Sequence, residues 1–239
     1  MIKLPILLTC LFVLGAASAQ AQTELEDKAL TMRPDPQNPV GENLKVPPAW
    51  KVRLDKPDPD VVIGSEEEGS DIRFVSMTPG WHITTGPRAI YYHPASTAEG
   101  EFVARAGIYL FPPGDRNEAY GLFVGGKNLD GAEQRYLYFL VRRSGEFLIK
   151  ERRGGETEVV HEWTASDAVN PYTEETSGTV KNVLSIDAGE EFVVFRVNDT
   201  EVARLPRTEL DVDGIVGLRI NHALNVHVDD FAVEFPDSM

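Results

Sequence analysis

The chain has 239 residues, with 23 basic and 38 acidic side chains and a formal net charge of −15 at pH 7. This acidity argues against nucleic acid and anionic lipid as partners, because both repel a negative surface. The single cysteine, Cys10, lies in an N-terminal apolar run, so the rest of the chain has no disulfide, thiol nucleophile or cysteine zinc site. No later segment is apolar enough to predict a membrane span.

Residues 1–21 are typical of a secretory signal peptide. Lys3 precedes an apolar run over residues 4–13, and small residues follow at 15–21. We expect cleavage after Ala19 or Ala21. An uncleaved anchor would need about 20 apolar residues, more than this run supplies. The sequence therefore predicts an exported protein, periplasmic or secreted.

Residues 22–45 are predicted to form a flexible, proline-rich leader, and residues 46–239 a single domain. Prolines at 34, 36 and 39 interrupt helices and central strands. A first strand, at the edge of a sheet, is expected over residues 50–54. The length that remains suits one large β-sandwich or barrel.

The clearest strands are expected at residues 101–111, 118–124 and 136–142. The first alternates apolar and polar residues, and the third places Leu137, Phe139 and Val141 on its apolar side. Such period-two alternation indicates strands with one buried face. We expect these three segments to be consecutive strands of one antiparallel sheet.

Further strands are predicted on both sides of this region, and no ten-residue segment shows helical periodicity. A hairpin turn is expected at Asn198-Asp199, and residues 167–179 form a loop long enough to be a lid or binding loop. The other expected strands are residues 71–77, 89–92, 147–152, 157–163, 180–187, 192–197, 201–205, 214–221 and 225–235. The pattern predicts an all-β sandwich or barrel.

The segments 100–105, 118–123, 193–202 and 214–219, arranged around a β-meander, resemble the concanavalin A-like jelly roll. The resemblance implies a jelly-roll sandwich of two antiparallel sheets over about residues 50–235. Within this architecture the chain is most similar to the 3-keto-disaccharide hydrolase domain, often labelled family 16-like. In such folds the concave face of one sheet generally holds carbohydrate, which the resemblance implies for this chain by analogy.

The chain lacks the catalytic patterns of related enzymes. Retaining glucanases of this architecture carry a Glu-x-Asp-x-(x)-Glu strand, which places two carboxylates on one face about 5 Å apart. No such strand occurs in this sequence, and no Gly-x-Ser-x-Gly elbow occurs either. No cofactor is expected. No metal ligand is assigned, because Asp115, Asp130, Asp229 and Asp230 form no recognised spacing, and a loop cation site is the one metal site left open.

The candidate binding surface is the polar face of the strands, which collects Tyr and Arg. Aromatic rings suit the apolar face of a sugar, and Arg, Asn and Glu bind its hydroxyl groups. The expected ligand-binding residues are Glu101, Arg105, Tyr109, Tyr136, Tyr138, Arg142, Arg219 and Asn221. Additional candidates are His82, His93, Tyr120 and His222.

These observations favour an exported jelly-roll domain that binds a glycan on a Tyr- and Arg-rich concave sheet face. A glycoside or 3-keto-glycoside hydrolase is the alternative, and it requires histidines or acids such as Glu101 and Glu118 to converge on one pocket. In a third interpretation, a structural or protein-binding sandwich, the Tyr and Arg pairs only stabilise the sheet. Two titratable groups at one pocket would favour the enzyme, whereas a shallow aromatic platform would favour binding.

Overall fold

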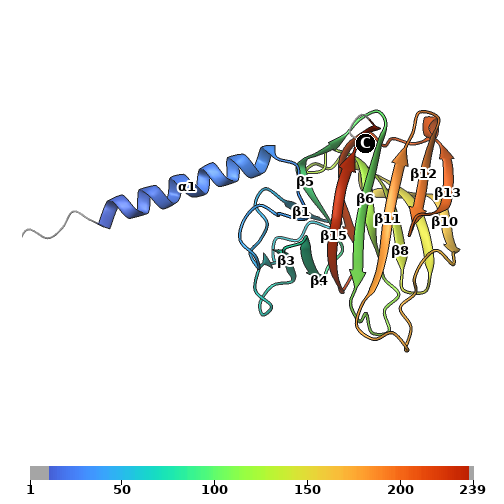
Figure 1. Cartoon of the computed structure of the whole chain (residues 1–239), viewed down its shortest axis with the longest axis horizontal. Coiled ribbons are helices and arrows are strands. Elements are labelled where there is room, and N and C mark those ends of the chain that lie inside the picture. The colour runs from blue at the N-terminus through green and yellow to red at the C-terminus, as the bar shows by residue number, and fades with distance from the viewer. Residues whose placement is uncertain (1–10, 237–239) are drawn as a thin grey trace, which may run out of the picture.

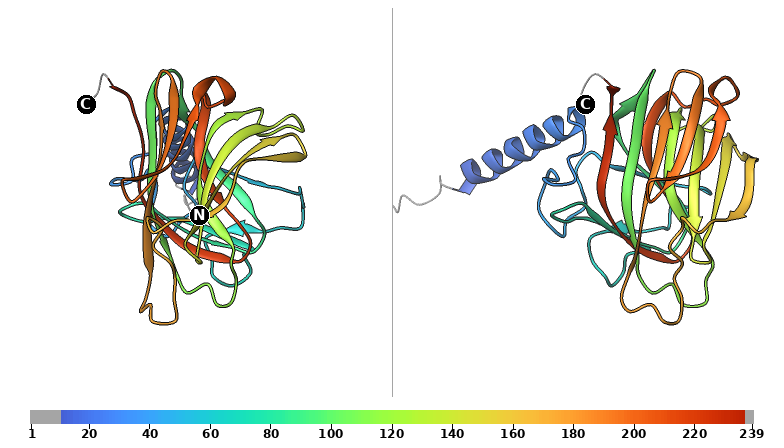
Figure 2. Two further views of the ribbon diagram at one scale, coloured as in Figure 1. Left: turned by 90° about the vertical axis from the view of Figure 1, so that its right-hand side faces the viewer. Right: turned by 45° about the vertical axis from the view of Figure 1, so that its right-hand side comes forward.

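The computed structural model describes residues 11–236, with side chains from residue 19 onward, and shows a sandwich of two β-sheets (Figures 1 and 2). This confirms the predicted all-β sandwich. Cys10 and the start of the expected signal peptide lie outside the described residues. Across the described residues, no helix combines the length and the apolar character needed to cross a membrane.

Sheet A has seven strands in the order β1-β5-β14-β7-β8-β9-β10, all paired antiparallel. Its strands are β1 (Lys51–Leu54), β5 (Ala89–Ala98), β7 (Ala119–Lys127), β8 (Arg135–Arg142), β9 (Glu146–Arg153), β10 (Glu156–Ala165) and β14 (Gly214–Ile220). As predicted, the first strand lies at an edge, and β8, β9 and β10 form a meander.

Sheet B has eight strands in the order β13-β12-β11-β6-β15-β4-β3-β2. Its strands are β2 (Ile63–Gly64), β3 (Ile72–Ser76), β4 (Trp81–Thr85), β6 (Phe102–Leu110), β11 (Val180–Ala188), β12 (Phe192–Val197), β13 (Thr200–Pro206) and β15 (Leu224–Glu234). The short β2 pairs with β3 in parallel, and the other pairs are antiparallel. Asn198 and Asp199 have positive φ angles of 48° and 65°, as the predicted hairpin turn requires. A 3₁₀ turn, η1 (Arg207–Glu209), follows β13.

The main core lies between the two sheets and is filled by the alternating apolar residues of their strands. Phe102 and Ile108 of β6 point into it from sheet B, and Phe139 of β8 and Leu218 of β14 point into it from sheet A. All four side chains are at most 1% exposed. The inward positions predicted from the alternation are therefore confirmed.

The expectation that residues 101–142 form three consecutive strands of one sheet is wrong. β6 lies in the middle of sheet B, between β11 and β15, whereas β7 and β8 are neighbours in sheet A. The chain crosses from one sheet to the other between Leu110 and Ala119. Alternation could not reveal this crossing, because strands of both sheets turn an apolar face toward the same core.

The outer face of sheet A, which points away from the main core, is also largely buried. It carries a second cluster that includes Tyr92, Phe123, Tyr136, Tyr138 and Leu140, with Trp163 and Ile215 packed against it. Phe123 lies 5.2 Å from Tyr136, and Tyr136 lies 5.6 Å from Tyr138, between ring centroids. Tyr138, which the sequence placed on a polar face, is only 5% exposed.

The N-terminal segment contains a helix that the periodicity did not predict. Helix α1 (Leu11–Thr31) extends away from the sandwich (Figure 1) and spans both predicted cleavage positions. The sequence reasoning depended on prolines, and the first of these in the mature segment, Pro34, comes after the helix ends. Residues 11–31 are rich in Ala, Leu, Glu and Gln, which are good helix formers.

Part of the expected leader is bonded to the domain. The Leu44 amide donates to the Ser76 carbonyl at 2.8 Å, and the Ser76 amide donates to the Lys45 carbonyl at 2.9 Å. Arg33 Nη2 donates to the Thr97 carbonyl at 2.8 Å. Ala29, at the end of α1, is 1% exposed. Proline excludes regular structure without excluding such contacts, and the flexibility expected of residues 22–45 stays a prediction.

Candidate functional site

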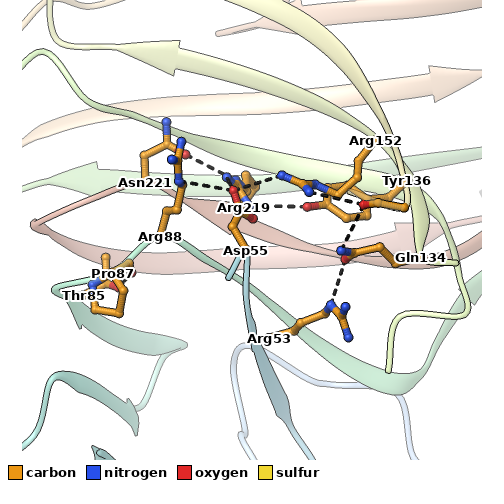
Figure 3. A network of polar contacts seen from close by, with 11 residues as sticks. Arg53, Asp55, Thr85, Pro87, Arg88, Gln134, Tyr136, Arg152, Arg219 and Asn221 are labelled. Carbon is orange, nitrogen blue, oxygen red and sulfur yellow. Dashed lines mark hydrogen bonds and ion pairs between the residues drawn. The ribbon is translucent and has the colours of Figure 1, made fainter. Parts of the chain in front are cut away.

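A cluster of three arginines surrounds the carboxylate of Asp55 on the outer face of sheet A (Figure 3). Arg219 of β14 binds both carboxylate oxygens, and its Nη2 lies 2.7 Å from Oδ2. Arg152 Nη2 donates to the same Oδ2 at 3.1 Å, and Arg88 Nε lies 3.3 Å from it. We call these four residues the Asp55 cluster.

Strand geometry places the members of the cluster together. Leu218 and Ile220 point into the core, so Arg219 between them points outward. Arg152 of β9 lies opposite Tyr136 of β8, which belongs to the outer cluster. Asp55 directly follows β1, and Arg88 directly precedes β5, the strand with which β1 pairs.

The arginines keep Asp55 ionised. Burial of the Asp55 carboxyl opposes ionisation, but the hydrogen bonds from Arg219 and the positive charges of the three arginines outweigh burial and lower its pKa below the ordinary value. Burial likewise opposes the charged form of Arg219, yet its hydrogen bonds to Asp55 raise the Arg219 pKa above its usual value. Both groups are therefore charged at neutral pH.

Beside the Asp55 cluster lies a hollow of about 400 Å³, which we call the arginine pocket. Tyr138 and Leu140 of β8 and Leu148 of β9 give it an apolar surface, and Trp163 of β10 adds an aromatic ring. Its lining residues are Asp55, Lys56, Arg88, Tyr138, Leu140, Leu148, Lys150, Arg152, Gly155, Thr157, Trp163, Arg219 and Asn221. Rings beside hydrogen-bond donors can bind a sugar through both its apolar face and its hydroxyl groups.

The ring of Trp163 is held by Arg142. The Arg142 guanidinium carbon lies 4.1 Å from the Trp163 ring centroid, a cation–π distance. Arg142 in turn binds the Glu146 carboxylate through Nε, at 2.7 Å, and through Nη2, at 2.5 Å. The indole at the pocket edge is therefore pre-oriented, which reduces the entropy lost when a ligand contacts it.

A second hollow, of about 450 Å³, is lined by residues of the same outer face. Tyr92 and Leu129, from the outer cluster, and the neighbouring Ile215 supply its apolar side. Tyr92 Oη donates to Asp130 Oδ1 at 2.7 Å, and Lys51 Nζ donates to Asp130 Oδ2 at 2.8 Å. The outer face of sheet A thus offers two places where a ligand can lie.

Five of the eight predicted ligand-binding residues do share one face. Tyr136, Tyr138, Arg142, Arg219 and Asn221 all belong to the outer side of sheet A. Arg219 Nη1 donates to Tyr136 Oη at 3.4 Å, and its Nε donates to Asn221 Oδ1 at 3.3 Å. Tyr138, Arg219 and Asn221 line the arginine pocket.

The other three predicted residues lie elsewhere, and their expected place on the same surface is wrong. Arg105 and Tyr109 are on β6, and Glu101 directly precedes it, so all three belong to sheet B. Tyr109 Oη donates to Asp229 Oδ2 at 3.1 Å, and Arg105 lies 3.6 Å from Glu234 and 3.8 Å from Asp230. The cause is that the chain crosses from sheet B to sheet A between β6 and β7. The alternation of apolar and polar residues does not reveal this crossing.

The four additional candidate residues do not lie together at one site. His82 faces His227 and Phe111 on the outer face of sheet B, at ring-centroid distances of 6.3 and 5.2 Å. His93 is buried beside Trp50 in sheet A, and its Nδ1 accepts a hydrogen bond from the Ala95 amide at 3.1 Å.

The other two candidates are equally separate. Tyr120 points into the main core, where its hydroxyl accepts a hydrogen bond from Asn182 Nδ2 at 3.1 Å. His222 lies in the turn between β14 and β15. None of the four lines the arginine pocket.

Sequence reasoning missed Asp55, Arg88, Arg152, Lys150 and Trp163. Asp55 directly follows a strand and Arg88 directly precedes one, so neither belongs to an alternating pattern. Lys150 and Arg152 carried a usable signal, because they alternate with Ile149 and Glu151 along a predicted strand of the meander. Extending the face of Tyr136 and Tyr138 by one strand would have included them.

The arginine pocket does not contain the two carboxylic acids that most glycosidases need. Asp55 is its single lining carboxylate, and three arginines hold it. Glu101 and Glu118 precede strands of different sheets, so they do not supply a pair. Among the described residues, no three His, Cys, Asp or Glu side chains form a group that could hold a metal ion.

The two apposed sheets and their strand order make this chain a concanavalin A-like jelly-roll sandwich. Carbohydrate-binding module CBM66 from Bacillus subtilis superposes with a TM-score of 0.53 at 12% identity, over 78% of this chain and 96% of that one. The GH16 protein of a Bacteroides ovatus mixed-linkage glucan locus, solved in complex with a product, has a TM-score of 0.53 at 10% identity, over 82% of this chain and 96% of that one. No family model matches the sequence, and no curated protein matches it, so the resemblance to the 3-keto-disaccharide hydrolase domain stays a prediction.

Proposed function

We propose that this protein is a saccharide-binding module whose ligand lies in the arginine pocket on the outer face of sheet A. The proposal is based on the side chains that line the pocket. The pocket combines the pre-oriented ring of Trp163 with polar donors from Asn221 and Lys150, over an apolar floor of Tyr138 and Leu140. A sugar ring has an apolar face and a rim of hydroxyl groups, and this lining is complementary to both.

The same pocket favours binding over hydrolysis. Hydrolysis with retention or inversion needs an acid and a second carboxylate at a defined separation. Asp55 is bound on both oxygens by Arg219, so it is neither a proton donor nor a free nucleophile at neutral pH. The shared fold of a carbohydrate-binding module and a GH16 protein supports either activity by analogy only, and the lining of the pocket supports binding.

A glycan array followed by titration calorimetry tests the proposal. Trp163→Ala should weaken binding of the array hits by about 2 kcal/mol, because the ring supplies the main apolar contact. Asn221→Ala removes a smaller polar contact in the same pocket. It tests the same site if Trp163→Ala disturbs folding. Tyr109→Ala, on the outer face of sheet B, is the matched control and should leave affinity unchanged. If only Tyr109→Ala lost binding, the binding site would lie on sheet B instead. If the wild-type protein hydrolysed one of the array hits, the hydrolase alternative would be supported.

Export is part of the same proposal, and it depends on the signal-peptide pattern of residues 1–21. A periplasmic or secreted location would give the module access to extracellular polysaccharide. Mass spectrometry of the protein recovered outside the cytoplasm should give an N-terminus at Gln20 or Gln22. Recovery of the intact chain beginning at Met1 would contradict it.

A further inference from the structure

The charge of the arginine pocket is opposite to that of the whole chain. The chain has a formal net charge of −15, yet the pocket is lined by five cations and one carboxylate. The cations are Lys56, Arg88, Lys150, Arg152 and Arg219, and the carboxylate is Asp55. Clefts lined by one sign of charge concentrate ligands of the opposite sign, and low-dielectric walls strengthen this effect. A neutral sugar can accept hydrogen bonds from these side chains, but only an anionic ligand would also use their net positive charge.

Part of this positive charge is buried without a counter-ion. The side chains of Arg152 and Arg219 are 9% and 4% exposed, and they share the one carboxylate of Asp55, which is 10% exposed. Both Asp55 oxygens bind Arg219, and Arg152 has a single bond to one of them. Arg152 Nε is buried and has no hydrogen-bond partner. Buried charges are normally paired, so a further anion would complete the Asp55 cluster.

Two other cations can reach a ligand from the more open part of the pocket. Arg88 has a side chain that is 44% exposed, and its Nε alone contacts Asp55, at 3.3 Å. Lys150 is partly exposed, and within the described part of the chain no carboxylate lies within ion-pair distance of it. Lys150 lies opposite Tyr138 on the neighbouring strand, and both side chains line the pocket. Donors thus approach the same volume from β9 and from the start of β5.

We infer that the ligand of this pocket is an acidic saccharide, with a uronate carboxylate held among Arg88, Lys150 and Arg152. This inference rests on the proposed function and names its substrate class. A carboxylate is planar and matches the paired donors of a guanidinium, which makes charge-assisted, bidentate hydrogen bonds to it. Arg219 is already occupied by Asp55 and acts as a positioning residue, because it fixes the carboxylate that orients Arg152.

Titration calorimetry with matched oligosaccharides tests the inference. The probes are tetrasaccharides of galacturonate, glucuronate and mannuronate, and each is compared with the same tetrasaccharide after its carboxyl groups have been reduced to alcohols. At least one uronate should bind tenfold or more tighter than its neutral partner, with an affinity that falls as salt rises. Lys150→Gln should abolish that preference, whereas Arg105→Gln, on sheet B, should leave it unchanged. Sulfated and unsulfated forms of one neutral tetrasaccharide form the second arm.

The outcomes separate this inference from the function on which it depends. If neutral and acidic forms bind equally, and Lys150→Gln changes neither, the acidic ligand is overturned while saccharide binding stands. If the sulfated form binds and no uronate does, the carboxylate assignment is overturned. If no saccharide on the array or in the panel binds the folded protein, the proposed function itself fails. A uronate preference that persists in Lys150→Gln would overturn the placement of the carboxylate.

Discussion

Asp55 and Arg219 stand 164 positions apart in the sequence, yet they form a two-point ion pair on the outer face of sheet A. The pair joins the segment after β1, at the edge of the sheet, to β14, two strands further in. Arg152 from β9 and Arg88 from the start of β5 contact the same carboxylate. The contact thus connects four segments of sheet A and forms one wall of the candidate site.

Removal of the Asp55 charge should destabilise the domain strongly. Asp55→Asn leaves Arg152 and Arg219 buried without a counter-ion, and the loss of one partner of a buried ion pair lowers the free energy of unfolding by about 3–5 kcal/mol. Urea unfolding followed by tryptophan fluorescence measures the change. Asp130→Asn is the control, because the Asp130 side chain is 71% exposed in its pair with Lys51 and should contribute less than about 1 kcal/mol. Equal effects of the two variants would contradict the role given to Asp55.

The stability of the domain should decrease in mild acid because of His82. Burial, followed by the nearby charges of Arg73 and His227, lowers the pKa of His82 from 6.5 to about 4. Between these two values the unfolded chain binds a proton that the folded domain does not, so the free energy of unfolding falls as the pH falls through this window.

Proton NMR titration of the His82 ring reads this pKa directly, and unfolding curves across the same pH window read its effect on stability. His82→Gln should remove this part of the pH dependence. Arg73→Gln should raise the pKa of His82, because it removes a neighbouring positive charge. A ring that titrates at its ordinary pKa in the wild type would contradict the burial of His82 on sheet B.

Neighbouring residues of β8 should both matter for stability, for different reasons. Phe139 is 0% exposed between the sheets, and Phe139→Ala should lower the free energy of unfolding by about 3–5 kcal/mol through the cavity that it leaves. Tyr138→Ala should cost at least about 2 kcal/mol as well, because the ring is buried in the outer cluster against Tyr136. Alternation alone would have predicted a nearly neutral Tyr138→Ala.

Tyr138→Phe separates the contribution of the ring to stability from that of the hydroxyl, since it keeps the ring and removes only the hydroxyl. It should retain the wild-type free energy of unfolding within about 1 kcal/mol. Thermal and chemical unfolding of the three β8 variants should therefore rank Phe139→Ala and Tyr138→Ala well below Tyr138→Phe. A stable Tyr138→Ala protein would show that the outer face of sheet A is open to solvent.

The segment between α1 and β1 should exchange its amide hydrogens slowly at specific positions. The Leu44 amide is bonded to Ser76, and the Ser76 amide is bonded to Lys45, so both should be protected in hydrogen–deuterium exchange followed by NMR. The amide of Glu67, which is exposed in the loop before β3, is the control and should exchange quickly. Fast exchange at the Leu44 amide would support the flexible leader that was predicted from the prolines.

The sequence determined which residues of each strand face the core. Leu137, Phe139 and Val141 were assigned inward from alternation alone, and the structure buries all three. This was possible because successive side chains of a strand point to opposite sides, a property of the local backbone. The absence of a paired-carboxylate strand was equally readable, since that motif is contiguous in the chain.

Only the tertiary structure decided which sheet each strand joins and what covers its second face. Tyr109 and Tyr138 have the same local pattern, yet one lies on sheet B beside Asp229 and the other on sheet A within a second apolar cluster. Sheet membership depends on where the chain crosses the sandwich and on hydrogen bonds between distant strands. Neither produces a periodic pattern of apolar and polar residues in the sequence. Asp55 shows the same limit, because an isolated acid after an edge strand gains its role only when folding brings Arg219, Arg152 and Arg88 around it.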